Sequence, residues 1–320
     1  MVKVSIIIPC MEIGRGLERC LDSISRLNNR SFETIILPDF NKKIHFKDYK
    51  IVPTGKIRPA EKRNLGVKLA KGEILAFIDD DAYPRTDWIE KALIAFENKK
   101  IGIVGGPNLT PKEDNYWSKC GGDVLTSWLT GTSSIRYQIG KKPKRVWELP
   151  TCNLFIRKEL FNFVKGFDTT LLTAEDSKLC FDILNLGKEV WYFPNIIVFH
   201  HRRELFIDHA KQMWIYGRDI AWLLKEQFSF EKIYYGILSL FVLFVFFGFI
   251  ISIFFEWFRL IYVSFLLLYL FIVLFSSLLF KIERSLCIFF GLILTHFSYG
   301  FGFLYGLFRS RHSTLYSQIW

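Results

Sequence analysis

The chain has 320 residues, of which 51% are hydrophobic and 33 are phenylalanine, and its mean hydropathy is +0.22. The apolar excess begins at about residue 230, which indicates a globular part followed by a membrane part rather than two soluble domains. The formal net charge is +11, but the basic residues are scattered and no nucleic-acid motif accompanies them. The scattered distribution therefore argues against a nucleic-acid partner, and the positive charge favours a membrane face or an anionic substrate.

The six cysteines show no paired metal-ligand spacing, which is typical of buried thiols in a reducing compartment. The apolar run that Pro9 ends is too short for a signal peptide and predicts a first strand instead.

Short apolar runs alternate with amphipathic stretches over the first hundred residues. The runs predict buried strands, at residues 4–9, 32–39, 73–79 and 101–107. The amphipathic stretches predict helices, at residues 16–27, 59–72 and 87–98. This alternation is typical of a largely parallel sheet that helices cover on both faces. Residues 108–149 have no regular pattern and predict a long functional loop.

Acidic side chains follow two of the predicted strands at their carboxyl ends. Asp39 ends the second strand, and Asp79, Asp80 and Asp81 follow the third. Ligands of such sheets bind beyond the carboxyl ends of the strands, so these acids should face one crevice. Adjacent carboxylates repel unless a positive charge lies among them, and hard oxygens suit Mg²⁺ or Mn²⁺ held together with phosphates. On spacing alone, a nucleotide site, a phosphohydrolase, a two-metal nuclease and a simple surface turn all remain open.

Several motifs occur in a recognisable order: "VSIIIP", "FETIILPD", "KRNLGVKLAKGEILAFIDDDAYPRTDWI" and "GFDTTLLTAEDSKLC". Over residues 2–222 the chain thereby resembles the inverting family 2 glycosyltransferases. The resemblance implies a GT-A fold, in which one α/β domain with a mostly parallel sheet binds a nucleotide-diphosphate sugar. It further implies a catalytic domain over residues 1–228 and a C-terminal membrane domain over residues 229–320, as in the membrane-attached branch of the family.

The resemblance also assigns a donor site. The family's D-x-D motif falls on the three consecutive aspartates, with Asp79 toward the ribose and Asp81 on a divalent cation, Mg²⁺ or Mn²⁺. The implied metal ligands are Asp79, Asp81 and His200. The implied nucleotide-sugar ligands are Pro9, Cys10, Met11, Asp39, Arg63, Asp79 and Asp80. Lys62, the neighbour of Arg63, is expected to be solvated on its helix.

The second acidic pair, Glu175 and Asp176, falls on the family's E-D motif, in which the aspartate is the general base. Such a carboxylate takes the proton of an acceptor hydroxyl as that oxygen attacks the anomeric carbon. Without the resemblance, the two acids would be read as the first turn of a helix. The residues implied near the acceptor or in a lid are Asn153, Glu175, Gln212 and Arg218.

Three apolar segments, at about 233–255, 260–280 and 286–308, are each long enough to cross a hydrocarbon core of ~30 Å. Three spans would put the basic residues 309–312 outside if the first domain is cytoplasmic, against the positive-inside tendency. Two spans with a re-entrant or interfacial third segment would keep them inside. We expect three spans, hence a multi-pass protein of the cell membrane with a cytoplasmic catalytic domain.

The sequence thus predicts a membrane-bound, metal-dependent, inverting glycosyltransferase. Its expected partners are a nucleotide-diphosphate sugar, the bilayer and an acceptor glycan, namely a lipid-linked saccharide of cell-surface glycan synthesis. A processive polysaccharide synthase is an alternative, although the Q-x-x-R-W signature of that class is absent. A non-catalytic nucleotide-sugar-binding membrane protein and a membrane phosphohydrolase are further alternatives.

Overall fold

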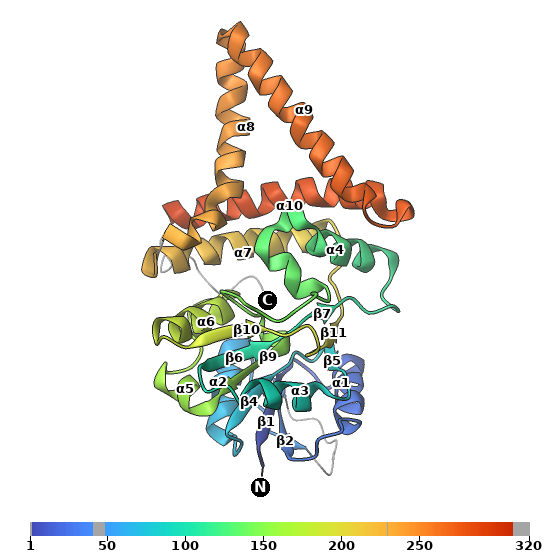
Figure 1. Ribbon diagram of the computed structural model, residues 1–320, viewed down its shortest axis with the longest axis vertical. Coiled ribbons are helices and arrows are strands. Elements are labelled where there is room, and N and C mark those ends of the chain that lie inside the picture. Colours follow the sequence, from blue (N-terminus) through green and yellow to red (C-terminus); the bar gives the residue numbers. More distant parts are fainter. Residues whose placement is uncertain (1, 41–48, 229, 310–320) are drawn as a thin grey trace. The chain divides into compact units, whose positions relative to one another are not determined.

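The computed structural model of the chain describes residues 2–40, 49–228 and 230–309 (Figure 1). It comprises two compact units. The first, here called the sheet unit, contains Met1–Asp114 and Ile135–His201. The second, here called the helical unit, contains Asn115–Ser134 and Arg202–Trp320. The helical unit therefore begins earlier in the chain than the apolar segments that the sequence marks.

The sheet unit is built on an eight-stranded sheet. In sheet order, its strands are β3 (Lys50–Ile51), β2 (Phe32–Leu37), β1 (Val4–Pro9), β4 (Ile74–Phe77), β9 (Leu154–Arg157), β6 (Ile101–Gly105), β10 (Glu189–Tyr192) and β8 (Lys144–Arg145). The first four are parallel to one another, and β10 is parallel to β6. β9 is antiparallel to both β4 and β6, and β8 is antiparallel to β10. The four strands predicted from apolar runs are therefore all present in one mixed sheet.

Helices cover both faces of this sheet, as the sequence predicted. One face carries α1 (Arg15–Ser25) and α3 (Trp88–Ala95), and the other carries α2 (Pro59–Leu69), α5 (Lys158–Phe163) and α6 (Glu175–Asn185). Successive residues of β1 feed the two cores in turn, because side chains alternate along a strand. Ile6 and Ile8 pack in the core under α1, whereas Ile7 packs in the core under α2.

A second, three-stranded sheet determines where the candidate site lies. Its order is β5 (Ala82–Pro84), β11 (Val198–His200) and β7 (Asn108–Leu109). β5 follows the acid cluster at the end of β4 directly, and the antiparallel register pairs His200 with Ala82. This pairing brings the end of β11 beside Asp81, more than a hundred residues away in sequence.

The helical unit contains five α-helices among its described residues. They are α4 (Tyr116–Thr126), α7 (Ile207–Glu226), α8 (Ile237–Phe254), α9 (Glu256–Leu278) and α10 (Ile282–Phe308). α4 lies within the segment that the sequence left irregular. Its paired glycines, Gly121 and Gly122, are weak helix formers and hide it from pattern analysis. Three stretches are long and apolar enough to cross a membrane: Lys232–Phe254, Glu256–Leu278 and Ile282–Phe308.

Asn153 joins three segments of the sheet unit and is fully buried. Its Oδ1 accepts a hydrogen bond of 2.8 Å from Trp88 Nε1. Its Nδ2 donates to the carbonyl oxygens of Pro107, at 3.1 Å, and Ile196, at 2.8 Å. Both polar atoms of the amide are engaged inside the unit, so Asn153 supports the fold. The place beside a sugar that the resemblance implied stays a prediction.

We expect Asn153→Ala to lower the midpoint of thermal unfolding by about 4–8 °C. The substitution leaves the buried Trp88 indole N–H and the Ile196 carbonyl without a partner, at about 1–3 kcal/mol for each unsatisfied group, partly offset by relaxation. The Pro107 carbonyl still accepts a hydrogen bond from the Val198 backbone N–H. Thermal unfolding of the detergent-solubilised protein measures the effect. Asn162→Ala, at an exposed position of α5, is the matched control. An equal midpoint for both variants would contradict the structural role of Asn153.

Candidate functional site

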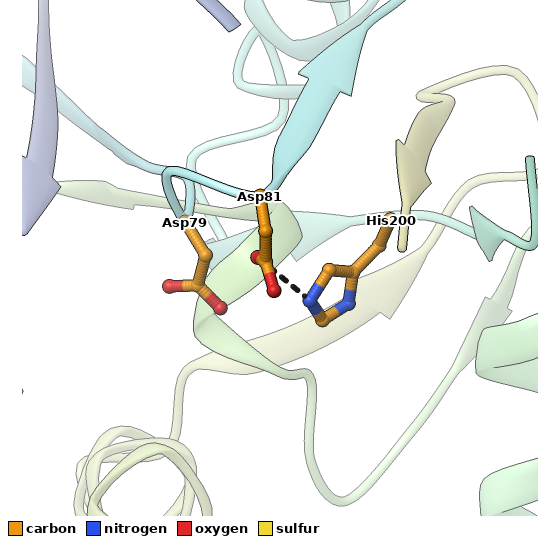
Figure 2. Close-up of side chains that lie close together, drawn as sticks. All are labelled: Asp79, Asp81 and His200. Atoms are coloured by element: carbon orange, nitrogen blue, oxygen red, sulfur yellow. Dashed lines mark ion pairs between the residues drawn. The ribbon is translucent and has the colours of Figure 1, made fainter. Parts of the chain in front are cut away.

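Two carboxylates and one imidazole converge at the end of β4. The ligand atoms of Asp79, Asp81 and His200 all lie within 4.8 Å of one another. His200 Nε2 is 3.0 Å from Asp81 Oδ1, and Figure 2 shows the imidazole ring facing that carboxylate with Asp79 alongside. The structure thus brings together the three residues expected to bind a metal. Carboxylate oxygens suit Mg²⁺ and Mn²⁺, and an imidazole nitrogen extends the choice toward softer divalent cations.

The environment of His200 favours a positive charge at this position. Burial alone would lower the pKa of His200, but the Asp81 carboxylate outweighs burial and raises that pKa well above its usual value. Conversely, His200 lowers the pKa of Asp81 against the effect of burial. Two negatively charged groups and one imidazole therefore form a site that a proton or a divalent cation would neutralise.

Cys152 supports the orientation of His200. With Nε2 directed at Asp81, the other ring nitrogen is left for the hydrogen bond between His200 and the Cys152 side chain. Asn108 Nδ2 lies 3.0 Å from Cys152 Sγ. Partners of this kind fix the tautomer and the ring direction of a ligating histidine. Sequence analysis missed the role of both residues, because they are far from His200 in sequence. The pairing of β7 with β11 brings Asn108 near His200, and Cys152 comes from the turn Thr151–Asn153 that precedes β9.

Arg63, on α2, links this cluster to the second acidic pair. Its Nη2 is 2.7 Å from Asp79 Oδ1, and its Nη1 is 2.9 Å from Glu175 Oε1. The Arg63 side chain is only 5% exposed. Arg63 Nε and Glu175 Oε2 are buried without a hydrogen-bond partner among the described residues. One guanidinium therefore holds both predicted acid motifs in a single site.

Glu175 and Asp176 occupy the first turn of α6 and have strongly perturbed acidities. Burial, and next the Asp176 carboxylate, raise the pKa of Glu175 to about 8. Burial, and next Glu148, raise the pKa of Asp176 to about 6. The Ser177 backbone N–H donates to Asp176 Oδ1 at 2.7 Å. Adjacent acids with separated pKa values near neutrality are typical of sites that transfer protons.

The charges of Glu148 and Arg136 act on Asp176. Sequence analysis singled out neither residue. Arg136 Nη2 is 2.9 Å from Glu148 Oε1, and Ser177 Oγ donates to the other oxygen of Glu148. Both residues belong to the segment that the sequence left irregular. No local pattern reveals them, because their role depends on packing against α6.

The ends of β1 and β2, which precede β4 in the order of the sheet, carry further predicted site residues. The Asp39 backbone N–H donates to Met11 O at 3.1 Å, and Lys62 Nζ donates to Cys10 O at 2.5 Å. Lys62 also forms an ion pair with Asp39. The prediction that Lys62 is solvated is wrong, since the residue is 3% exposed. Burial, with the Asp80 carboxylate next, raises the pKa of the Cys10 thiol to about 12, which makes it a poor nucleophile.

Asp80 and Pro9 complete this side of the site. Burial, with the Asp81 carboxylate next, raises the pKa of Asp80 to about 7. Asp80 is not part of the group that could hold a metal ion, and its charge interacts with Lys62 instead. Pro9 ends β1 and is buried. Residues 41–48 of the chain lie outside the described residues.

Two of the expected lid residues belong to the helical unit. Gln212 and Arg218 both lie on α7. Gln212 Nε2 donates to Tyr216 Oη at 2.9 Å, and Arg218 pairs with its neighbour Asp219 at 2.7 Å. Arg218 is 2% exposed and packs against the rings of Trp214 and Trp222.

The chain is similar to several known proteins. The model of glycosyl transferase family group 2 matches residues 74–303. A pre-mycofactocin glycosyltransferase of Mycobacterium tuberculosis is 25% identical over 171 residues, which cover 51% of this chain and 34% of that protein. This chain thus spans about a third of that relative's length.

A second relative aligns over most of both chains. It is the dolichyl N-acetyl-alpha-D-glucosaminyl phosphate 3-beta-D-2,3-diacetamido-2,3-dideoxy-beta-D-glucuronosyltransferase of Methanococcus voltae. The two proteins are 23% identical over 257 residues, which cover 74% of this chain and 77% of the relative.

Among solved structures, this chain is similar to the mannosyltransferase PcManGT of Pyrobaculum calidifontis, determined in complex with GDP-Man and Mn²⁺. The TM-score is 0.51 at 16% identity, over 68% of this chain and 62% of the other. The likeness confirms the predicted GT-A fold.

Proposed function

Because the chain belongs to glycosyl transferase family group 2, we propose that it is a membrane-bound, metal-dependent, inverting glycosyltransferase. It moves a sugar from a nucleotide-diphosphate donor to an acceptor hydroxyl. The observation that carries this proposal is the Arg63 bridge, which holds the Asp79 cluster and the Glu175–Asp176 pair in one site. Separate groups of acids are thereby available for donor binding and for proton removal, and the two groups lie close together.

The donor occupies the crevice beyond the ends of β1, β2 and β4. Its nucleoside lies at Pro9, Cys10, Met11 and Asp39, where the ion pair with Lys62 holds the Asp39 carboxylate in place. Asp79, Asp81 and His200 would hold a divalent cation, which supplies positive charge to the diphosphate leaving group. Arg63 adds a second positive charge on the same side.

Asp176 is the proposed general base. With a pKa of about 6 it is mostly ionised at neutral pH, yet basic enough to accept the proton of an attacking hydroxyl. Glu175, with a pKa of about 8, is mostly protonated there and does not compete for that proton. An ionised base without an activated nucleophile fits a single displacement, and the raised pKa of the Cys10 thiol argues against a covalent route. Single displacement inverts the configuration at the anomeric carbon.

We assign catalysis to residues 1–228 and membrane attachment to residues 229–320, with the catalytic part cytoplasmic. A lipid-linked saccharide is the favoured acceptor, because enzyme and acceptor that share a bilayer meet at a raised effective concentration. The Methanococcus voltae relative, whose name specifies a dolichyl phosphate-linked sugar, supports this acceptor class.

The acidic residues around Asp176 favour sugar transfer over non-catalytic sugar binding as the function. A binding protein has no use for a carboxylate whose pKa is raised toward neutrality by burial and, next, by a second carboxylate, Glu148. Such an arrangement costs stability and is typical of proton-transfer sites.

We expect Asp176→Asn to reduce sugar transfer by about 10²–10⁴-fold, because the amide cannot accept the hydroxyl proton. Donor binding should persist, since Asp176 is not in the metal cluster. A thermal-shift screen of nucleotide sugars identifies the donor, and transfer of its labelled sugar to lipid extracts measures activity. Glu159→Gln, on the exposed side of α5, is the control. Normal turnover in Asp176→Asn would end the assignment of the base.

The pH dependence should report the pKa of Asp176. Transfer should fall as the pH drops through about 6, because protonation removes the base. Glu148→Gln removes the neighbouring negative charge, so the pKa of Asp176 falls and the acidic limb of the pH–rate profile moves to lower pH. A limb that stays in place or moves to higher pH would contradict the coupling. Glu73→Gln, an exposed glutamate, should leave the profile unchanged.

Stabilisation by the donor should depend on the divalent cation. At a hundredfold excess over its Kd, a ligand stabilises the folded protein by ~2.7 kcal/mol. We expect chelation, or Asp81→Asn, to remove most of the thermal shift that a nucleotide sugar with Mn²⁺ produces. Asp22→Asn, at an exposed position of α1, should retain that shift. A full shift in the presence of a chelator would contradict metal dependence.

A further inference from the structure

Helix α10 lies along α7 in parallel register within the helical unit. Toward the start of the pair, His209 Nε2 is 2.7 Å from Thr295 Oγ1. Toward its end, Trp222 Nε1 donates to Arg309 O at 3.0 Å. Figure 1 shows the two helices side by side over most of their length. The two helices therefore share one direction.

Glycines make this contact close. A Cβ atom on Gly302 would lie 2.0 Å from Trp214 O, and one on Gly306 would lie 2.4 Å from Arg218 O. On α7, a Cβ on Gly217 would lie 2.2 Å from Tyr299 O. Small residues on both helices thus let the backbones touch. The glycines in both helices thus specify the close pairing. Because the two backbones touch, the two helices must lie at the same depth in any membrane.

α7 is not a candidate span. Asp208 and Lys211 are 63% and 69% exposed near its start, and Lys225 is exposed near its end. Between these ends, Arg218 and Asp219 form a buried ion pair. Charged side chains at these positions are costly in hydrocarbon, so α7 belongs outside the membrane core. A helix held against it from Thr295 to Arg309 cannot cross the core either.

The first turns of α10 are fixed to α4, a second helix that is too short and polar to span. Tyr116 Oη donates to Glu283 O at 2.8 Å, and Arg284 pairs with Asp123 at 2.7 Å. Both ends of α10 are therefore bound to polar helices of the same unit, which places them on one side of the bilayer.

The opposite face of α10 is apolar and exposed. Its residues repeat at helical spacing, and the most exposed are Ile282, Leu286, Phe290, Phe301 and Phe308. In its most apolar window 50% of the residues are buried inside the protein, against 22% for each of the other two candidate spans. The buried face holds all four glycines together with Ser285, Thr295 and His296, besides a few apolar residues. A helix that is attached to the protein along one face and exposes apolar side chains on another is suited to the membrane surface.

We infer that α10 lies in the plane of the membrane interface, with its apolar stripe against the bilayer, and that α8 and α9 alone cross it. This inference rests on the proposed membrane attachment and replaces the third span expected from the sequence. α8 and α9 are joined by Phe255 alone, and at ~1.5 Å per residue they are ~27 and ~34 Å long. The exposed Trp257 and Glu256 at their junction suit the far interface.

This arrangement resolves the charge conflict in the sequence. With two spans, Lys281 and Arg309 both remain on the side from which α8 enters the membrane. The chain reaches α8 from the sheet unit through α7, without a candidate span among the described residues before Lys232. Both basic ends of α10 then share the side of the catalytic domain, as the positive-inside tendency requires. Of the basic cluster at 309–312, Arg309 alone lies among the described residues.

Single cysteines test the sidedness. All six native cysteines are buried, so the unaltered protein gives the background. We expect a membrane-impermeant maleimide to label Lys281→Cys and Arg309→Cys from the same face of sealed vesicles, and Glu256→Cys from the opposite face. Labelling of Arg309→Cys from the face of Glu256→Cys would overturn the inference. Labelling of all three from one face alone would also refute membrane insertion of α8 and α9, and donor binding in detergent would test the glycosyltransferase proposal separately.

Depth measurements give an independent test. Spin labels at Leu286, Phe290, Phe301 and Phe308 should report one shallow depth from oxygen and nickel-chelate accessibility, whereas a label at Phe247 in α8 should lie deep. A profile along α10 that deepens toward its middle would overturn the inference. So would low access to both quenchers, which would mean that another protein surface covers the stripe.

Discussion

The candidate site depends on one buried guanidinium. Arg63 is the cation through which the acids at the end of β4 and those at the start of α6 coexist, and it touches one carboxylate from each group. Removing such a group would leave Asp79 and Glu175 facing each other without compensation, which is far more costly than losing an exposed ion pair. The positions of the donor and of the proposed base are thereby coupled through a single side chain.

The same helix supplies a second buried cation at the adjacent position. Lys62 reaches Asp39 and the Cys10 carbonyl, while Arg63 reaches the other two acids. Both can do so because α2 lies close against the sheet. A Cβ atom on Gly66 would be 2.7 Å from Ile7 Cγ2, so any larger residue would push the helix away. One glycine therefore determines how deep both cations lie among the acids.

What the sequence could predict follows from how local each signal is. The apolar runs predicted β1, β2, β4 and β6. The acids that follow β4 and those that begin α6 are also contiguous in the sequence. The partners Cys152 and Glu148 are not, because they meet His200 and Asp176 only through strand pairing and helix packing. Lys62 was misjudged for a related reason. A lysine on a helix is usually solvated, and no periodic pattern reveals a crevice at the end of the neighbouring strands.

The three apolar helices show, in another way, what amino-acid composition alone does not predict. Length and apolarity treat α8, α9 and α10 alike, since all three exceed the length that a span requires. The distinction lies in which residues face the protein. α10 turns His296, Thr295 and its glycines inward and exposes Phe290, Phe301 and Phe308, whereas α8 buries little more than Ser239, Val242, Gly248 and Ser252. Glycines let the backbones of α10 and α7 approach each other closely. In the arrangement inferred above, this attachment to a charged helix outweighs the apolar composition of α10 in deciding where it lies.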